Sequence, residues 1–212
     1  MLSHVIERVQ ATVGLDEVVL ATSESDRDTP LLAVAAWHGI RAWRGSEWDV
    51  LGRMCGAARW AEADVVLRVT ADCPLWAPDV GELVLDAHRV LRAAGYGLAY
   101  AWNDTCRSGY PDGLDAEAFD VALLEQAAAR ATRQEDREHV TPGVRFLAKT
   151  MTTVRARFDL SRGLKLSVDR EEDLRLVQSV ARYLVPGRLA WPDTATALVA
   201  CGLVSATQLE AV

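Results

Sequence analysis

The carboxylate of Asp72 is the side chain best placed to do chemistry in this sequence. An apolar run at 65–67, together with Val69, ends in the letters TADCP at 70–74, a pattern typical of a buried strand that delivers one acid to the edge of a sheet. Ligands of open α/β sheets bind beyond the carboxyl ends of the strands, and a carboxylate at that edge suits a hard divalent metal ion. The alternative is that Asp72 only caps a turn or the start of a helix.

Two other charged residues lie in or near predicted strands. Arg68 belongs to the same strand as the acid and could reach a phosphate or an acceptor substrate, or it could pair with a neighbouring carboxylate. Asp169 lies where a predicted strand at 164–168 gives way to a predicted helix at 171–184. Whether these residues can act together depends on the elements that carry them.

Helical and strand patterns alternate along the chain. Helices are predicted from Leu2 onward and at 29–39, 49–61, 78–94, 121–132, 136–147 with a break at 141–142, and 171–184, with a small helical tail after 187. Strands are predicted at 17–22, 40–44, 65–69, 98–102, 114–119, 152–158 and 164–168, the last two as a hairpin. The sequence contains no repeat, low-complexity segment or linker, which indicates a single domain over 1–212.

The composition argues against several classes of function. The net charge of −7 disfavours nucleic acid as a partner, because a protein that binds its backbone needs a basic face. No apolar run reaches the length of a membrane span, and the N-terminus lacks the apolar core of a signal peptide. The four cysteines show no CxxC spacing, so neither a disulfide framework nor a zinc site is indicated. We expect a protein of the reducing cytoplasm.

Seven stretches of the sequence resemble one family. They are LSHVIERV, DEVVLATSESDRDTPL, AWRGSEWDVLGR, RVTADCPL, YPDGLDAEAF, REHVTP and SVDREEDLRLV, and they follow one another in the family's order and spacing. Together they are similar to the cytidylyltransferases of the spore coat polysaccharide biosynthesis protein F family, relatives of the acylneuraminate and 3-deoxy-manno-octulosonate cytidylyltransferases. The resemblance covers most of the chain.

This resemblance implies a fold and a reaction. The fold is α/β, the nucleotide-diphospho-sugar transferase (glycosyltransferase A-like) three-layer sandwich with a mainly parallel sheet. The reaction transfers CMP from CTP to a sugar acid or another acidic or phosphorylated acceptor and releases pyrophosphate, with Mg²⁺. The metal-holding carboxylates of relatives match Asp72 and Asp169, and two carboxylates suit a hard cation that keeps several waters. A homodimer is also implied, with 103–117 as the expected contact.

Two pairs of residues match substrate-binding parts of the family. Thr22 and Ser23, at the polar end of the first predicted strand, lie where relatives place the nucleoside, and Ser23 could contact ribose or base. Glu138 and His139 resemble the family's acceptor-side motif. His139 could bond a sugar hydroxyl or a phosphate, but a structural role for this histidine is the alternative.

The YPDGLD segment offers a third set of candidates. Tyr110, Asp112 and Asp115 could line the acceptor pocket, or they could only shape a turn. Pro111 and Gly113 favour a turn in either case, because the backbone conformations of proline and glycine suit turns.

One part of the family pattern has no match. Relatives begin with a strand and a loop of the type QARMGSTRLPGK, whose N–H groups and basic side chains would hold the triphosphate. This chain starts after that loop, so we expect an N-terminally incomplete domain in which two strands lack their shared partner. A start codon assigned too late, completion by another polypeptide, and a non-catalytic nucleotide- or sugar-binding homologue acting as an interaction subunit are three explanations. The chain alone is expected to be inactive.

Overall fold

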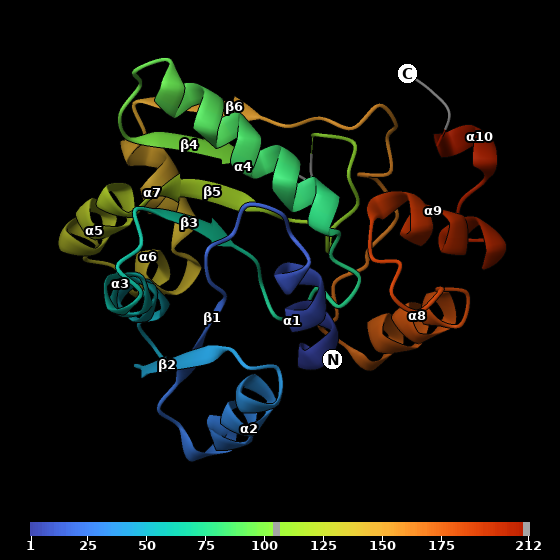
Figure 1. Ribbon diagram of the computed structural model, residues 1–212, viewed down its shortest axis with the longest axis horizontal. Coiled ribbons are helices and arrows are strands. Elements are labelled where there is room, and N and C mark those ends of the chain that lie inside the picture. Colours follow the sequence, from blue (N-terminus) through green and yellow to red (C-terminus); the bar gives the residue numbers. More distant parts are fainter. Residues whose placement is uncertain (104–106, 210–212) are drawn as a thin grey trace.

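The computed structural model describes residues 1–103 and 107–209, and its elements alternate as the sequence indicates (Figure 1). The strands are β1 Val19–Ser23, β2 Arg41–Gly45, β3 Val65–Arg68, β4 Ala99–Trp102, β5 Glu117–Asp120 and β6 Thr150–Thr153. The helices are α1 Leu2–Gln10, the 3-10 turn η1 Asp26–Asp28, α2 Thr29–Trp37, α3 Val50–Trp60, α4 Pro78–Ala93, α5 Val121–Arg130, α6 Gln134–His139, α7 Thr141–Leu147, α8 Glu171–Ala181, α9 Trp191–Ala200 and α10 Ala206–Leu209.

Four strands form the larger sheet, in the order β3-β5-β4-β6. β5 runs antiparallel to both of its neighbours, whereas β4 and β6 are parallel. β1 and β2 form a separate parallel pair, with Ser23 opposite Gly45. The larger sheet is therefore mixed, because the reversed strand β5 lies between β3 and β4.

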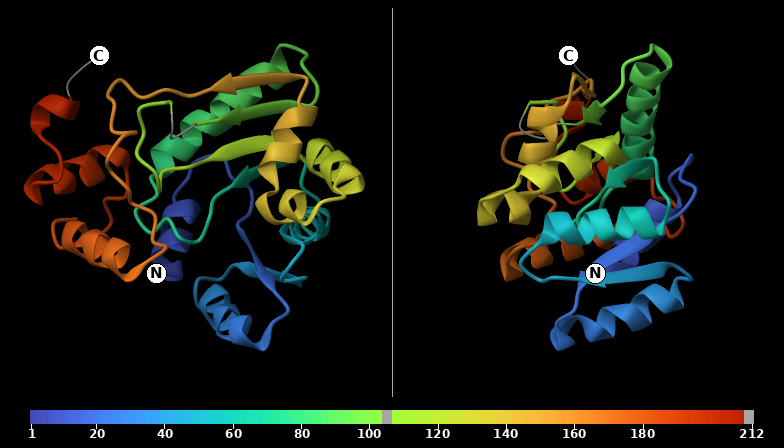
Figure 2. Two further views of the ribbon diagram at one scale, coloured as in Figure 1. Left: turned by 180° about the vertical axis from the view of Figure 1, so that it is seen from behind. Right: turned by 90° about the vertical axis from the view of Figure 1, so that its left-hand side faces the viewer.

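Helices cover both faces of the larger sheet, which gives the expected three layers (Figure 2). α4 packs across β4, β5 and β6 on one face, and α5 packs against β5 beside α3 on the other. Successive residues of β5 serve the two faces, since Ala118 belongs to the core under α4 and Phe119 to the core under α5. Phe119 stacks on the buried Tyr100, with 5.7 Å between the ring centroids. Alternation along each strand thus supplies both cores.

The break between the two sheets leaves two strand edges unpaired. β1 and β3 are each the last strand of their sheet, and no described strand joins them. The N–H of Glu24 donates to the carbonyl of Gly45 at 2.8 Å, so alternation along β1 turns the N–H of Ala21 toward the opposite edge. β1 and β3 are thus two strands that share no partner among the described residues. Helix α3 packs against β1, β2 and α5, and so connects the two parts.

The hairpin predicted from 152–158 and 164–168 is wrong. β6 pairs with β4 instead, with Thr152 opposite Ala101. The segment 164–168 forms an isolated bridge between Lys165 and Asp112, and its N–H groups donate to loops rather than to β6. Periodicity identified two extended segments but not their partners.

The C-terminal helices α8 and α9 lie beyond one end of the larger sheet (Figure 1). They pack on a core that α4 and the loop at 110–114 also line, and in this core Leu166, Val180 and Leu198 are wholly buried. Within 1–103 and 107–209, no helix combines the length and the apolar character needed to cross a membrane.

Candidate functional site

The loop that follows β3 meets the segment that precedes α8. The backbone N–H of Val168 donates to the carbonyl of Asp72 at 2.8 Å, so Asp169 comes one residue after the point of contact. Asp72 is half-buried, and the side chain of Asp169 is 62% exposed. The two aspartates singled out from the sequence therefore lie on adjoining segments, although β3 and α8 are far apart in the chain.

The loop of Asp112 and Gly113 holds the other side of the same segment. The N–H of Leu166 donates to the carbonyl of Asp112 at 2.7 Å, and the hydroxyl of Ser167 donates to the carboxylate of Asp112 at 3.0 Å. Gly113 has φ +98°, and a Cβ at this position would lie 2.5 Å from the backbone nitrogen of Ser167. Only glycine meets both conditions, so the turn reading describes this segment, and an acceptor pocket lined by Asp112 and Asp115 stays a prediction.

Asp115 brings a third carboxylate to this region. Its Oδ2 accepts from the N–H of Gly113 at 3.0 Å, and its carbonyl accepts from the indole N–H of Trp76 at 3.0 Å. Burial raises the pKa of the Cys73 thiol, and the negative charges of Asp72 and Asp115 raise this pKa further. Cys73 is therefore a protonated packing residue at neutral pH and not a nucleophile.

Lys165 is the basic residue of the region. Its Nζ lies 2.7 Å from a carboxylate oxygen of Asp169 and 2.6 Å from one of Asp173. Hydrogen bonds to Asp169 and Asp173 raise the pKa of Lys165, and the bond from Lys165 lowers the pKa of Asp173. The sequence interpretation missed this residue, although Lys165 and Asp169 are four positions apart and Lys165 is one of only two lysines.

A cavity of about 230 Å³ lies between the loop that follows β3, at Ala71, and the end of β1. Thr22, Ser23, Arg53 and Ala71 are among the residues that line it. Ser23 is buried, and its hydroxyl donates to Asp28 at 2.5 Å and accepts from the N–H of Ser25. Thr22 and Ser23 thus line the same cavity as Ala71. Ala71 directly precedes Asp72 in the chain, so this cavity adjoins the loop that carries Asp72.

Arg53 gives this cavity a positive group. Its Nη1 donates to the carbonyl of Ser46 at 2.9 Å, whereas its buried Nε has no partner among the described residues. Burial lowers the pKa of Arg53, and the nearby Asp28 and Asp49 oppose that effect. The sequence pattern gave no reason to select this arginine.

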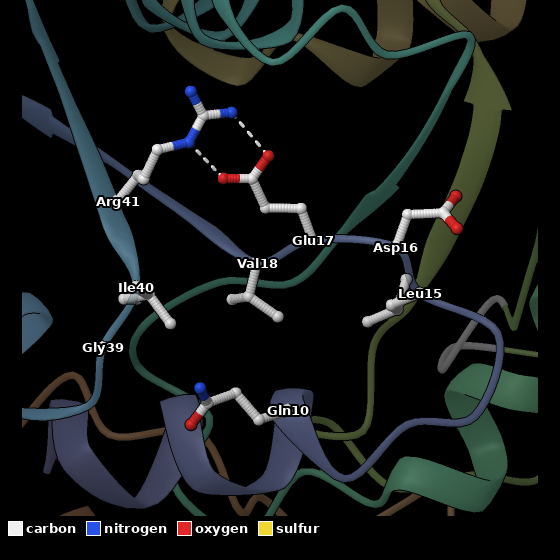
Figure 3. A pocket seen from close by; sticks show the side chains of 8 residues that line it. All are labelled: Gln10, Leu15, Asp16, Glu17, Val18, Gly39, Ile40 and Arg41. Carbon is white, nitrogen blue, oxygen red and sulfur yellow. Dashed lines mark hydrogen bonds and ion pairs between the residues drawn. The ribbon is translucent and has the colours of Figure 1, made fainter.

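A second cavity, of about 320 Å³, lies at the opposite end of β1 (Figure 3). It is lined by Gln10, Leu15, Asp16, Glu17, Val18, Gly39, Ile40 and Arg41. Figure 3 shows Glu17 and Arg41 joined in a two-point ion pair, which lowers the pKa of Glu17. None of the predicted site residues lines this cavity, so we do not assign it to the site.

The structure places Arg68 in a different setting from the one predicted for a phosphate ligand. Its Nη1 donates to Glu117 on the neighbouring strand at 2.7 Å, and the hydroxyl of Tyr100 donates to the other oxygen of that carboxylate. The side chains of Arg68 and Glu117 are 24% and 13% exposed. The alternative reading, in which Arg68 pairs with a nearby acid, describes this geometry.

Three further candidates have no hydrogen bond or ion pair to either aspartate among the described residues. Tyr110 is buried and packs edge-on against Phe158, with 5.6 Å between the rings, so it belongs to the core. Glu138 and His139 are exposed on α6, which packs against α3. No hydrogen bond or ion pair of the described residues connects Glu138 or His139 to Asp72 or Asp169.

The chemistry of Asp72 and Asp169 is compatible with magnesium, which stays a prediction. The described part of the chain contains no group of three or more His, Cys, Asp and Glu side chains that could hold a metal ion. Asp72 and Asp169 would supply two carboxylates, and Mg²⁺ is commonly held by one or two carboxylates together with waters and substrate phosphates.

Known proteins resemble this chain in sequence. No family model matches the sequence. The chain is 26% identical over 186 residues to the uncharacterized protein MJ1063 of Methanocaldococcus jannaschii, a match that covers 86% of this chain and 73% of that protein. It is 30% identical over 131 residues to the spore coat polysaccharide biosynthesis protein SpsF of Bacillus subtilis, a match that covers 61% of this chain and 51% of SpsF. The matched region thus spans about half the length of SpsF.

Solved structures show the same fold. A cytidylyltransferase from Leptospira borgpetersenii superposes with a TM-score of 0.85 at 24% identity, and the match covers 100% of this chain and 86% of that one. A CMP:2-keto-3-deoxy-manno-octonic acid synthetase complexed with CTP superposes with a TM-score of 0.58 at 14% identity, over 85% of this chain and 87% of that one. These likenesses confirm the predicted fold class.

Proposed function

Because this chain shares its fold with a cytidylyltransferase from Leptospira borgpetersenii and resembles the spore coat polysaccharide biosynthesis protein SpsF, we propose that the protein is a CTP-dependent cytidylyltransferase. The acceptor would be a sugar acid or a related acidic or phosphorylated compound. The observation that carries the proposal is the bond from the N–H of Val168 to the carbonyl of Asp72, which joins the segments of the two carboxylates. We propose a cytoplasmic homodimer as its working form. Part of the expected contact, residues 104–106, lies outside the described residues.

Each part of the site has a role in this reaction. Thr22 and Ser23 would receive the nucleoside at the end of β1, and Arg53 would face its phosphates from α3. Asp72 and Asp169 would hold Mg²⁺, which supplies positive charge to the phosphates when it is bound. The acceptor oxygen then attacks the α-phosphorus, a new O–P bond forms, and the bond to the β-phosphate breaks as pyrophosphate leaves.

The test is release of pyrophosphate from CTP in the presence of sugar-acid acceptors. It is best run on the chain as given and on the protein extended by any reading frame found in the DNA upstream of Met1. We expect turnover from the extended protein. Absence of pyrophosphate from both forms, with intact folding and a panel of acidic acceptors, would overturn the proposal.

The split sheet favours one other function, a non-catalytic homologue that binds nucleotide or sugar as an interaction subunit. β1 and β3 share no described strand, which leaves backbone groups open to a partner polypeptide. This alternative predicts binding of CTP, measured by calorimetry, without turnover in any extended form, together with a stable complex with another chain.

A further inference from the structure

We propose that Lys165 is an internal counter-ion that competes with the divalent metal for Asp169 and thereby sets the metal affinity of the site. The inference rests on the proposed function, because it takes Asp72 and Asp169 as the metal ligands. It assigns Lys165 a positioning role, exerted through Asp169 rather than on substrate.

The geometry puts one ammonium between two carboxylates. Nζ of Lys165 lies 2.7 Å from Asp169 and 2.6 Å from Asp173. Asp173 is itself fixed, because its Oδ2 also accepts from the N–H groups of Asp169 and Arg170, at 3.0 Å each. Lys165 is the only cation of the described residues whose side chain is ion-paired with either proposed metal ligand.

The two ion pairs of Lys165, with Asp169 and with Asp173, differ in how easily another cation can replace the lysine. The side chain of Asp169 is 62% exposed, whereas that of Asp173 is 15% exposed. An ion pair between exposed groups is weak and readily replaced, and a divalent cation attracts the same carboxylate more strongly than an ammonium does. When metal takes Asp169, Lys165 keeps its partner on Asp173 and is not left unpaired. The segment can therefore change from one cation to the other without unfolding.

The variant Lys165→Met tests the competition directly. Binding of Mn²⁺ to the whole protein, followed by the loss of the free-ion signal in electron paramagnetic resonance, needs neither substrate nor activity. We expect Lys165→Met to bind Mn²⁺ about threefold to fivefold more tightly, since a competing and repelling charge is gone. Lys165→Arg keeps the charge and should stay close to the unchanged protein.

A matched control separates this local effect from net charge. Arg175 lies on α8 in an exposed pair with Glu171, so Arg175→Met removes one positive charge without touching Asp169. We expect it to change the affinity less than Lys165→Met. If Lys165→Met binds Mn²⁺ equally or more weakly while Asp72→Asn abolishes binding, the counter-ion role is wrong and the metal site stands. If no Mn²⁺ binding depends on Asp72, the metal assignment fails as well.

Discussion

The backbone of Val168 is hydrogen-bonded to the backbone of Asp72 over 2.8 Å. Two loops that belong to different ends of the sequence therefore approach each other through main-chain atoms, and side-chain substitutions at either aspartate leave that bond in place. The carboxylates can consequently be changed one at a time without dismantling the loops that carry them.

Asp72→Asn and Asp169→Asn should each lower nucleotidyl transfer by about 100-fold or more, since an amide cannot replace a charged ligand at a metal site. The measurement is pyrophosphate release in the form of the protein that shows turnover. Asp86→Asn is the control, because Asp86 is a 67% exposed residue of α4 paired with Arg89. Normal turnover by the double variant of Asp72 and Asp169 would exclude the proposed metal ligands.

Gly113→Ala should destabilise the fold by about 2–4 kcal/mol, because it combines a positive φ with a Cβ placed against the backbone of Ser167. Gly163→Ala is the matched substitution, since Gly163 has φ +88° but no atom within 4 Å of its Cβ position. We expect it to cost only about 1 kcal/mol. Urea unfolding of both variants measures the difference, and equal losses would show that the close approach contributes nothing.

Much of the fold was predictable from local patterns, but its pairing was not. The apolar run before Asp72 identified β3, and the alternation of LDAEAF identified β5. Neither pattern specifies the direction of a strand or its neighbours. The position of β5 between β3 and β4, antiparallel to both, could therefore not be predicted from the sequence. The predicted hairpin failed for the same reason, because the donors of 164–168 are taken by the carbonyls of Asp112 and Asp72.

The candidate site was predictable only in part. The position of Asp169 after an extended segment was visible, but its neighbour Lys165 was not selected, because charge spacing of four is informative on helices and this segment is not helical. Tyr110 shows the opposite case. Its place in a motif suggested a pocket or a turn, and the structure shows Tyr110 buried against Phe158, a packing role that the motif did not indicate.

Arg68 and Glu117 should be energetically coupled. In a double-mutant cycle with Arg68→Met and Glu117→Gln, we expect a coupling of about 1–2 kcal/mol, because both groups are largely shielded from water. Chemical unfolding supplies the four stabilities. The exposed pair of Arg59 and Glu125, treated in the same way, should show no measurable coupling. Loss of activity without loss of stability in Arg68→Met would instead restore the phosphate role of this arginine.

His88 should make stability fall in mild acid. Burial lowers the pKa of His88, partly opposed by Asp120, whose carboxylate lies 3.7 Å away and is bonded by Arg92. Below about pH 6.5 the unfolded chain therefore binds a proton at His88 that the folded chain does not bind. The free energy of unfolding then falls with decreasing pH by up to about 1.4 kcal/mol per pH unit. Unfolding midpoints between pH 5 and 8 should show this slope.

The substitution His88→Gln should flatten that profile relative to the unchanged protein, even if its overall stability is lower. His4→Gln is the control, because the side chain of His4 is 69% exposed. An identical slope with and without His88 would assign the acid sensitivity to another group.

The separate pairing of β1 with β2 also bears on motion. This pair and α2 contribute few fully buried side chains, and Trp37 on α2 is 86% exposed. Such a unit can open while the larger sheet stays folded, so its amide protons should exchange with solvent together and well before those of β4 and β5. A polypeptide strand that paired with both β1 and β3 would slow that exchange. Deuterium uptake by the amides of residues 19–45 therefore measures whether the two sheets have been joined into one.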